Sequence, residues 1–213
     1  APLREAQLAE TRIINLLQYE TLIATKAARV RQAAPDRHLV DFGLRRAHGD
    51  EAGLLSARTS YLAGFDGSSN VLAGMCWNIP LFGTMAHSFI QAHDGEFAAF
   101  EDFARSHPRA NTLLIDTYDT EAAARGLAPL ARRLAADGIA IQGVRIDSGD
   151  LGQRAADVRA ILDADGLRDI RIFVSGNLDE YSVQALLAAG APIDGFGVGT
   201  RMNTSNDCPY LEC

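Results

Sequence analysis

Between residues 112 and 200 the sequence repeats one pattern, which constrains the fold more than any other feature. Each repeat is a short apolar run that ends in Asp, Ser, Gly or Thr and is followed by an amphipathic segment rich in Ala and Leu. The apolar runs are 112–116, 144–147, 170–174 and 193–198, and the helical segments are 120–136, 151–163 and 178–189. Strands that alternate with helices at this spacing predict a parallel sheet with right-handed crossovers.

The first half of the chain is less regular. It predicts one long helix or two abutting ones, a short strand that Gly43 ends, two further helices, a polar turn, and one apolar segment that is either helix or strand. These are residues 5–31, 38–43, 50–62 and 95–106, then the turn 64–70 and the segment 71–76. We therefore predict an α/β fold, an incomplete (β/α) TIM-like barrel, in one domain over residues 1–213. Because the chain enters a helix almost at once and stops without a closing element, we expect a fragment.

Composition excludes several classes of protein. The net charge of −7 and the pI of about 5.2 argue against a nucleic-acid-binding face, which normally needs clustered Lys and Arg. Cys76, Cys208 and Cys213 are odd in number and lack C-x-x-C spacing, so neither a zinc site nor a disulfide framework is predicted. No apolar run approaches the roughly 18 residues of a spanning helix, and the start has no signal-peptide form. We expect a cytoplasmic protein that contacts no membrane.

Three strand ends are rich in glycine and polar residues, namely 145–150, 174–177 and 197–201. Glycines let backbone N–H groups approach an anion, and the start of a helix adds partial positive charge. Ser148, Asp150 and Asn177 could instead merely cap helices. Three such ends in succession favour a phosphate site near the last two turns.

Charged residues stand at the ends of neighbouring strands. Asp116 and Asp147 should lie at one rim of the barrel, where they could bind Mg²⁺, hold ribose hydroxyls or orient a histidine. The alternatives are helix caps or ion pairs with Arg145. Arg145 precedes Asp147 by two residues and therefore points the same way, so it could clamp a carboxylate. Phe42 and Arg45 would add an aromatic face and a second cation.

His87 is the residue most suited to chemistry. It follows a Gly-Thr turn in the stretch 82–89 and could act as a general base or as a nucleophile toward a phosphoryl group. His48 is the competing candidate. The remaining histidines, His38, His93 and His107, are interpreted as surface or loop positions.

Taken together, these motifs resemble the nicotinate phosphoribosyltransferase family. The matching pieces lie in one order along nearly the whole chain: 21–29 (TLIATKAAR), 41–46 (DFGLRR), 69–74 (SNVLAG), 83–88 (GTMAHS), 116–120 (DTYDT), 144–151 (VRIDSGDL), 175–178 (SGNL) and 197–200 (GVGT). Any single piece is a weak signal, whereas the ordered series is specific.

The resemblance implies transfer of the phosphoribosyl group of PRPP to nicotinate, giving nicotinate mononucleotide and pyrophosphate in NAD biosynthesis. It implies Mg²⁺ and ATP as co-substrate, with His87 at the position of a histidine that is phosphorylated. The positions it implies for ligand contacts are Phe42 on the pyridine ring; Arg145 and Thr84 on its carboxylate; Asp116 and Asp147 on ribose, metal or histidine; Ser148, Gly149, Gly176 and Asn177 toward the ribosyl end; and Gly199 and Thr200 on the 5′-phosphate.

The family's close cousin uses nicotinamide and carries an acid in the turn that follows Phe-x-Gly. Ser69 stands at that place here, and an acid would repel a carboxylate, so the sequence favours nicotinate. Asp66 lies in the same turn and leaves nicotinamide as an alternative.

Relative to the family, we expect the N-terminal domain and the C-terminal end to be missing from this sequence. Family members are homodimers that share the active site, so we expect a partner subunit to complete it. Two other functions remain open: a non-catalytic barrel fragment that binds phosphate ligands, and a different phosphate-handling barrel such as an aldolase or isomerase. The last lacks the strand-end lysine that Schiff-base chemistry needs.

Overall fold

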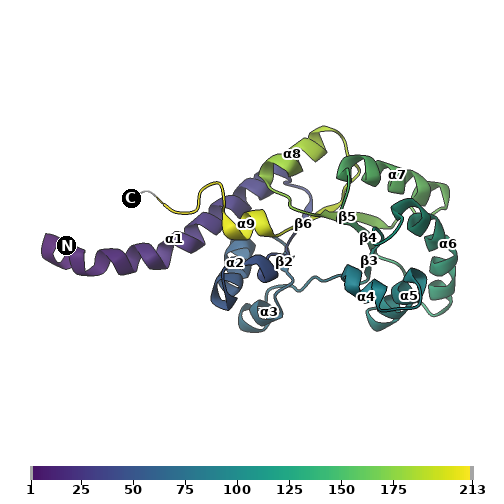
Figure 1. Ribbon diagram of the computed structural model, residues 1–213, viewed down its shortest axis with the longest axis horizontal. Coiled ribbons are helices and arrows are strands. Elements are labelled where there is room, and N and C mark those ends of the chain that lie inside the picture. The colour runs from purple at the N-terminus through teal and green to yellow at the C-terminus, as the bar shows by residue number, and fades with distance from the viewer. Residues whose placement is uncertain (1, 212–213) are drawn as a thin grey trace.

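The computed structural model describes residues 2–211, and its core is a parallel sheet with helices on one side (Figure 1). The elements in chain order are α1 (Leu3–Ala33), β1 (His38–Asp41), η1 (Leu44–Arg46), α2 (Asp50–Leu62), β2 (Gly67–Ser68), α3 (Val71–Trp77), α4 (His87–Gln91), α5 (Glu96–Ser106), β3 (Thr112–Leu114), α6 (Thr120–Ala136), β4 (Gly143–Ile146), α7 (Leu151–Ala164), β5 (Arg171–Ser175), α8 (Glu180–Ala188), β6 (Gly195–Val198) and α9 (Thr200–Thr204). The helix predicted at 50–62 and the one predicted at 120–136 have the predicted bounds.

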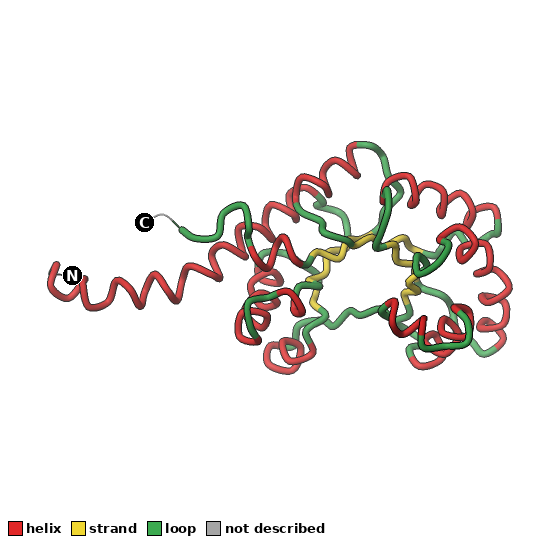
Figure 2. Tube along the Cα trace, viewed as in Figure 1, coloured by secondary structure: helices red, strands yellow, loops and turns green. Residues whose placement is uncertain are grey.

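The six strands described pair in parallel, in the order β2-β1-β6-β5-β4-β3. Figure 2 shows them as an arc, with the helices on its outer side and the segment between α3 and α4 running across its open side. Leu81 in that segment forms a parallel bridge with Ser68 at the β2 edge. The strands thus form an open half-barrel, which confirms the predicted incomplete α/β barrel.

Side chains alternate between the two faces of the sheet, as the two-residue period of a strand requires. The outward residues of neighbouring strands, such as Val144, Ile172 and Phe196, are fully buried beneath the helices. Gly195 and Gly197 stand on the inner face. A Cβ at Gly195 would lie 2.6 Å from the Phe173 ring, so these glycines leave room inside the arc for aromatic side chains.

The helices that follow β3, β4 and β5 begin at aspartates. Asp119, Asp150 and Asp179 each accept a hydrogen bond from a backbone N–H in the first turn of α6, α7 and α8. Such a cap typically stabilises a helix by about 1 kcal/mol. The capping interpretation of Asp150 is therefore correct. These caps fix the residue at which each helix begins after its strand.

The long helix α1 has two different halves. Its buried residues begin at Leu22, whereas its first half extends away from the body (Figure 1) and exposes residues such as Leu8 and Leu16. Lys26 is buried and donates to Glu180 at 2.8 Å and to Asp207 at 2.9 Å, so it joins α1 to α8 and to the C-terminal segment. Burial alone would lower the pKa of Lys26, but these two carboxylates raise it. None of the described helices is long and apolar enough to cross a membrane.

Of the two structures predicted for the segment 71–76, the helix is the correct one, as α3. Other short elements depart from the sequence predictions, and the polar turn 64–70 contains the two-residue strand β2. The short helices α4 and α9 were not predicted, and they begin at His87 and Thr200. Five residues are too few for an amphipathic period to show in the sequence.

Candidate active site

His87 faces the carboxyl end of the strands from the first position of α4. Its Nδ1 lies 3.0 Å from the Thr117 hydroxyl, and its Nε2 lies 3.8 Å from Asp147 Oδ2. The imidazole ring therefore lies between the carboxyl ends of β3 and β4. One nitrogen is engaged by a hydroxyl, and the other faces a carboxylate.

Arg145 is the centre of a polar network on β4. Its Nε donates to Ser175 Oγ at 2.8 Å, one terminal nitrogen donates to Thr84 Oγ1 at 2.5 Å, and the other donates to Asp147 Oδ1 at 3.0 Å. Three acceptors on three segments hold the guanidinium in one orientation. The ion pair between Arg145 and Asp147 was the structural alternative for both residues. This ion pair is present in the structure, and it keeps the Arg145 side chain within the candidate site.

Burial, which alone would raise the pKa of Asp147, is outweighed by its neighbours. The charge of Arg145, hydrogen bonds from Ser175 and Arg145, and the nearby His87 together hold this pKa below its ordinary value. Asp147 is thus a carboxylate at neutral pH.

Asp116 lies immediately behind this network. Its Oδ2 accepts hydrogen bonds from the Asp147 backbone N–H at 2.8 Å and from Ser148 Oγ at 2.6 Å. Its Oδ1 is buried and has no hydrogen-bond partner among the described residues. Ser148 donates to a carboxylate and caps no helix.

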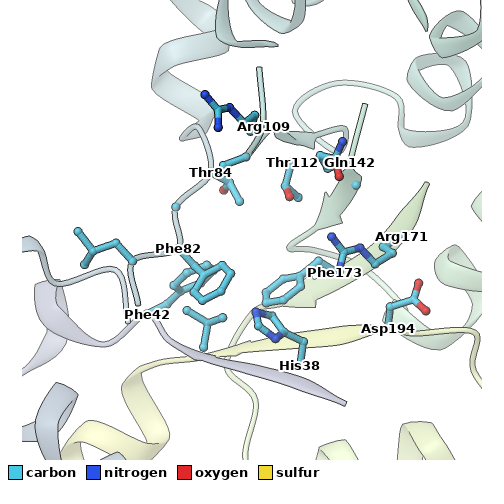
Figure 3. Close-up of a pocket in the computed structure, with 15 residues that line it drawn as sticks. His38, Phe42, Phe82, Thr84, Arg109, Thr112, Gln142, Arg171, Phe173 and Asp194 are labelled. Atoms are coloured by element: carbon cyan, nitrogen blue, oxygen red, sulfur yellow. The ribbon is translucent and has the colours of Figure 1, made fainter. Parts of the chain in front are cut away.

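An aromatic cavity of about 380 Å³ lies on the inner face of the arc toward the amino ends of the strands, where His38, Thr112, Gly143 and Arg171 line it. Phe42 and Thr84 also line it and connect it to the Arg145 network. Figure 3 shows the rings of Phe42, Phe82 and Phe173 grouped around it together with His38. The Arg145 guanidinium carbon lies 5.5 Å from the centre of the Phe42 ring, which is within cation–π range. A Cβ at Gly197 would lie 2.4 Å from the Phe42 ring, so the glycine is what admits the ring.

Backbone turns at the strand ends complete this rim. Gly176 has φ of +111°, and a Cβ there would lie 2.4 Å from the Asp147 carbonyl oxygen. Asn177 adopts the left-handed conformation with φ of 54° and starts no helix, so its side chain is no cap. Gly199 passes close to the Phe42 carbonyl, and Thr200 follows at the exposed start of α9. Gly149 lies beneath the side chain of Arg154.

Two predicted substrate contacts stand apart from the network. Arg45 is exposed on η1, and no hydrogen bond or ion pair within residues 2–211 links it to the cluster. Ser69 donates from its hydroxyl to the Asp41 carbonyl at 3.1 Å, at the end of β2. Asp66 accepts from Arg31 at 2.7 Å and from the Leu39 N–H at 2.8 Å, so its carboxylate is engaged near the opposite end of β1.

The interpretation of His38 as a surface or loop position is wrong. His38 is the first residue of β1, is half-buried, and lines the cavity with its ring 4.5 Å from that of Phe82. Its place on the inward face follows from the alternation along β1. His48 and His107 are exposed, and His93 lies at the end of α4, bonded to the Phe89 carbonyl.

Comparisons with known proteins identify the family of the chain. The model of the nicotinate phosphoribosyltransferase (NAPRTase) family matches residues 37–210. The chain belongs to this family.

Two curated relatives and one solved structure show how similar the chain is to individual members of this family. It is 52% identical over 212 residues to nicotinate phosphoribosyltransferase pncB2 of Mycobacterium tuberculosis, covering all of this chain and 45% of that protein. It is 44% identical to the nicotinate phosphoribosyltransferase of Bacillus subtilis, covering 99% of this chain and 43% of that one. The crystal structure of human nicotinic acid phosphoribosyltransferase superposes with a TM-score of 0.80 at 33% identity, over 93% of this chain and 51% of that one. The chain spans about half the length of these relatives.

Some residues of the candidate site were given no role in the sequence analysis. Thr117 and Ser175 contact His87, Arg145 and Asp147, yet each is a common hydroxyl residue next to a more conspicuous one. Position at a strand end was the signal that could have identified both. Phe173 was given no role either, because only the structure shows that its side chain lines the cavity inside the arc.

Proposed function

We propose that this chain carries the site that transfers the phosphoribosyl group of PRPP to nicotinate, giving nicotinate mononucleotide and pyrophosphate in NAD biosynthesis. The single observation that carries the proposal is the placement of Arg145. Its guanidinium lies over the ring of Phe42, and Thr84, Ser175 and Asp147 fix its orientation. An aromatic ring next to an oriented cation suits a planar aromatic carboxylate.

The choice of nicotinate over nicotinamide is supported by the turn around β2. Ser69 presents a hydroxyl and no charge, and Asp66 in the same turn is engaged by Arg31 and the Leu39 N–H. A carboxylate ligand therefore meets no free acid from this turn, whereas an amide ligand finds no acceptor acid.

The transfer itself needs an unprotonated pyridine nitrogen, whose lone pair forms the new bond to the anomeric carbon. The bond from that carbon to the pyrophosphate oxygen breaks, and the electron pair leaves with pyrophosphate. The carboxylates of Asp116 and Asp147 would stabilise the positive charge that develops on the ribosyl group. The hydroxyls of the ribosyl group would contact Gly176, Asn177, Ser148 and Gly149. Its 5′-phosphate would bind at Gly199 and Thr200.

We propose Mg²⁺ as the metal, held by Asp116 and Asp147. The fit rests on Asp116 Oδ1, a buried carboxylate oxygen without a partner in the described chain. No group of three or more His, Cys, Asp or Glu side chains within residues 2–211 could hold a metal, so PRPP and water would supply the other ligands, as is common for Mg²⁺. The ion would neutralise charge on the pyrophosphate.

We further propose ATP as co-substrate, coupled through phosphorylation of His87. Thr117 engages Nδ1, which leaves Nε2 open toward the site. Nε2 would form a bond to the γ-phosphorus of ATP as the bond to the bridging oxygen breaks and ADP leaves. Water would later cleave the phosphohistidine to phosphate. The added negative charge would lie beside Asp147, so it raises the energy of the phosphorylated state and favours its hydrolysis.

A homodimer with a shared active site is the assembly we propose, in the cytoplasm. Support comes from the first half of α1, where Leu8, Ile13, Leu16 and Leu17 are exposed on a helix that extends from the body. The described cysteines, Cys76 and Cys208, are free thiols, which suits a reducing compartment.

The experiment is a product assay with radiolabelled nicotinate or nicotinamide, in which PRPP, Mg²⁺ and ATP are varied separately. The proposal expects nicotinate mononucleotide only with PRPP and Mg²⁺, faster with ATP, and little product from nicotinamide. Preference for nicotinamide would overturn the choice of substrate. Binding of PRPP without turnover, with the partner segments of a full-length relative supplied, would instead favour a phosphate-binding fragment.

A further inference from the structure

Asp41 is a fully buried carboxylate that the proposed chemistry does not use. It ends β1, where His38, Val40 and Phe42 line the cavity and Asp41 points to the opposite face. A side chain on that face cannot touch a ligand inside the arc. Any role in the reaction must act through other residues.

Three segments of the chain donate to this one carboxylate: Gly43 after β1, Ser68 in β2 and Asn203 in α9. Oδ1 accepts from the Gly43 N–H at 2.9 Å and from Asn203 Nδ2 at 3.0 Å, and Oδ2 accepts from Ser68 Oγ at 2.9 Å. The Asp41 carbonyl also accepts from the Ser69 N–H at 2.9 Å. The residue thus joins the end of β1 to those of its two sheet neighbours, β2 and β6.

Burying the carboxylate of Asp41 costs free energy of hydration, which argues that the residue has a specific role. Burial raises the pKa of Asp41, because the charged form loses its hydration, and the hydrogen bonds from Gly43, Asn203 and Ser68 lower it only in part. An apolar side chain would avoid this penalty. An apolar side chain, however, could not accept these three hydrogen bonds, so it could not hold the three segments at fixed positions relative to one another.

Each of the three segments carries a part of the proposed site. Gly43 follows Phe42, and Ser68 precedes Ser69. Asn203 lies in α9, and its N–H donates to the Gly199 carbonyl at 3.0 Å. Asn203 also packs on the loop after Phe42, since a Cβ at Gly43 would lie 2.0 Å from its side chain.

We propose that Asp41 is a positioning residue that fixes the aromatic side of the rim, at Phe42 and Ser69, relative to the phosphate side, at Gly199 and Thr200. The assignment of the two sides rests on the proposed function. Binding at one side then changes affinity at the other, because both sides share the same buried acceptor.

Residue-level amide exchange tests the structural part without any ligand. In Asp41→Ala the amides of Gly43, Ser69 and Asn203 should exchange at least tenfold faster, while those of β4 and β5 stay unchanged. Asp41→Asn is the milder variant should the alanine variant not fold. Its amide oxygen still accepts from Gly43 and Asn203, but its NH₂ group faces Ser68, so the increase should be largest at residues 68–69.

Asp66→Asn is the matched control. It alters a carboxylate that also accepts a β1 backbone N–H, but near the opposite end of the strand. This control should leave the rim amides unchanged. Faster exchange in only one of the three segments, or an equal change at the rim in the control, would overturn the proposal.

A binding experiment tests the coupling. The nicotinate Kd is measured with and without saturating inorganic phosphate, which reaches the 5′-phosphate loop without touching the pyridine. The ratio should be at least fivefold in the wild type and close to one in Asp41→Ala. In Asp41→Asn, which keeps the hydrogen bonds from Gly43 and Asn203 but not the one from Ser68, the ratio should lie between these two values. A wild-type ratio in both variants would contradict the coupling. A protein that binds no nicotinate at all would count against the proposed function, while the exchange result would still decide the role of Asp41.

Discussion

The two sides of the rim use charge in opposite ways. On the β3–β4–β5 side, Asp147 faces His87 and pairs with Arg145, and Asp116 lies behind Asp147. On the β2–β1–β6 side, the buried charge of Asp41 points outward, and the inner face holds Phe42 and glycines. The first side suits chemistry on a charged ligand, and the second suits the holding of a ring and a phosphate by backbone and shape. A charge at a strand end is therefore informative only together with the face it occupies.

The loss of His87 should have the largest effect on the chemical side. In His87→Ala, incorporation of phosphate from ATP and the ATP-dependent part of nicotinate use should disappear. Because the His87 side chain is partly exposed, the free energy of unfolding should change by no more than about 0.5 kcal/mol. Labelled γ-phosphate and urea unfolding measure the two quantities. ATP hydrolysis that remains coupled to nicotinate use would remove His87 from the mechanism.

Arg145 should come second. Its replacement in Arg145→Leu leaves Asp147 without its cation and removes the carboxylate clamp, so kcat/KM for nicotinate should fall by about a thousandfold. Arg145→Lys keeps the charge but loses the forked geometry and should fall by about tenfold to a hundredfold. Steady-state kinetics with nicotinate decide this. Equal losses for the two variants would mean that charge alone, without geometry, binds the ligand.

A pair of glycine substitutions compares the two sides directly. Gly176→Ala forces a side chain into a positive φ and to within 2.4 Å of the Asp147 carbonyl, and it should destabilise the fold by about 1–3 kcal/mol. Gly199→Ala meets its nearest atom at 3.1 Å with a negative φ, so its cost should stay below about 1 kcal/mol. Urea unfolding of both variants gives the answer, and a reversed order would contradict the geometry.

The smallest effect concerns pH. Because the pKa of Asp147 is lowered in the folded protein, its ionised form stabilises the fold above the unfolded pKa of about 3.9, and this contribution is lost as the pH falls below that value. The ion pair with Arg145 is partly exposed, so the contribution should be about 1 kcal/mol or less. Asp147→Asn should remove it. Unfolding measured near pH 7 and below pH 4 should show a smaller difference for the variant than for the wild type.

The sequence allowed the chemical side of the rim to be predicted better than the other. The regular repeat placed Asp116, Arg145 and Asp147 at strand ends, and a two-residue period showed that Arg145 and Asp147 share a face. The β2–β1–β6 side could not be derived in this way. Strand β2 has only two residues and α9 only five, so neither shows a period, and the outward direction of Asp41 depends on a register that only pairing with β6 fixes. The role of Thr117 depends on where α4 places His87, which the sequence around Thr117 does not encode.

The most direct test of the account is a structure of the protein with nicotinate mononucleotide bound, since the product spans both sides of the rim. The account predicts the pyridine ring against Phe42, its carboxylate at Arg145 and Thr84, and the 5′-phosphate at Gly199 and Thr200. A product with its carboxylate away from Arg145, or with its phosphate on a different strand end, would contradict it.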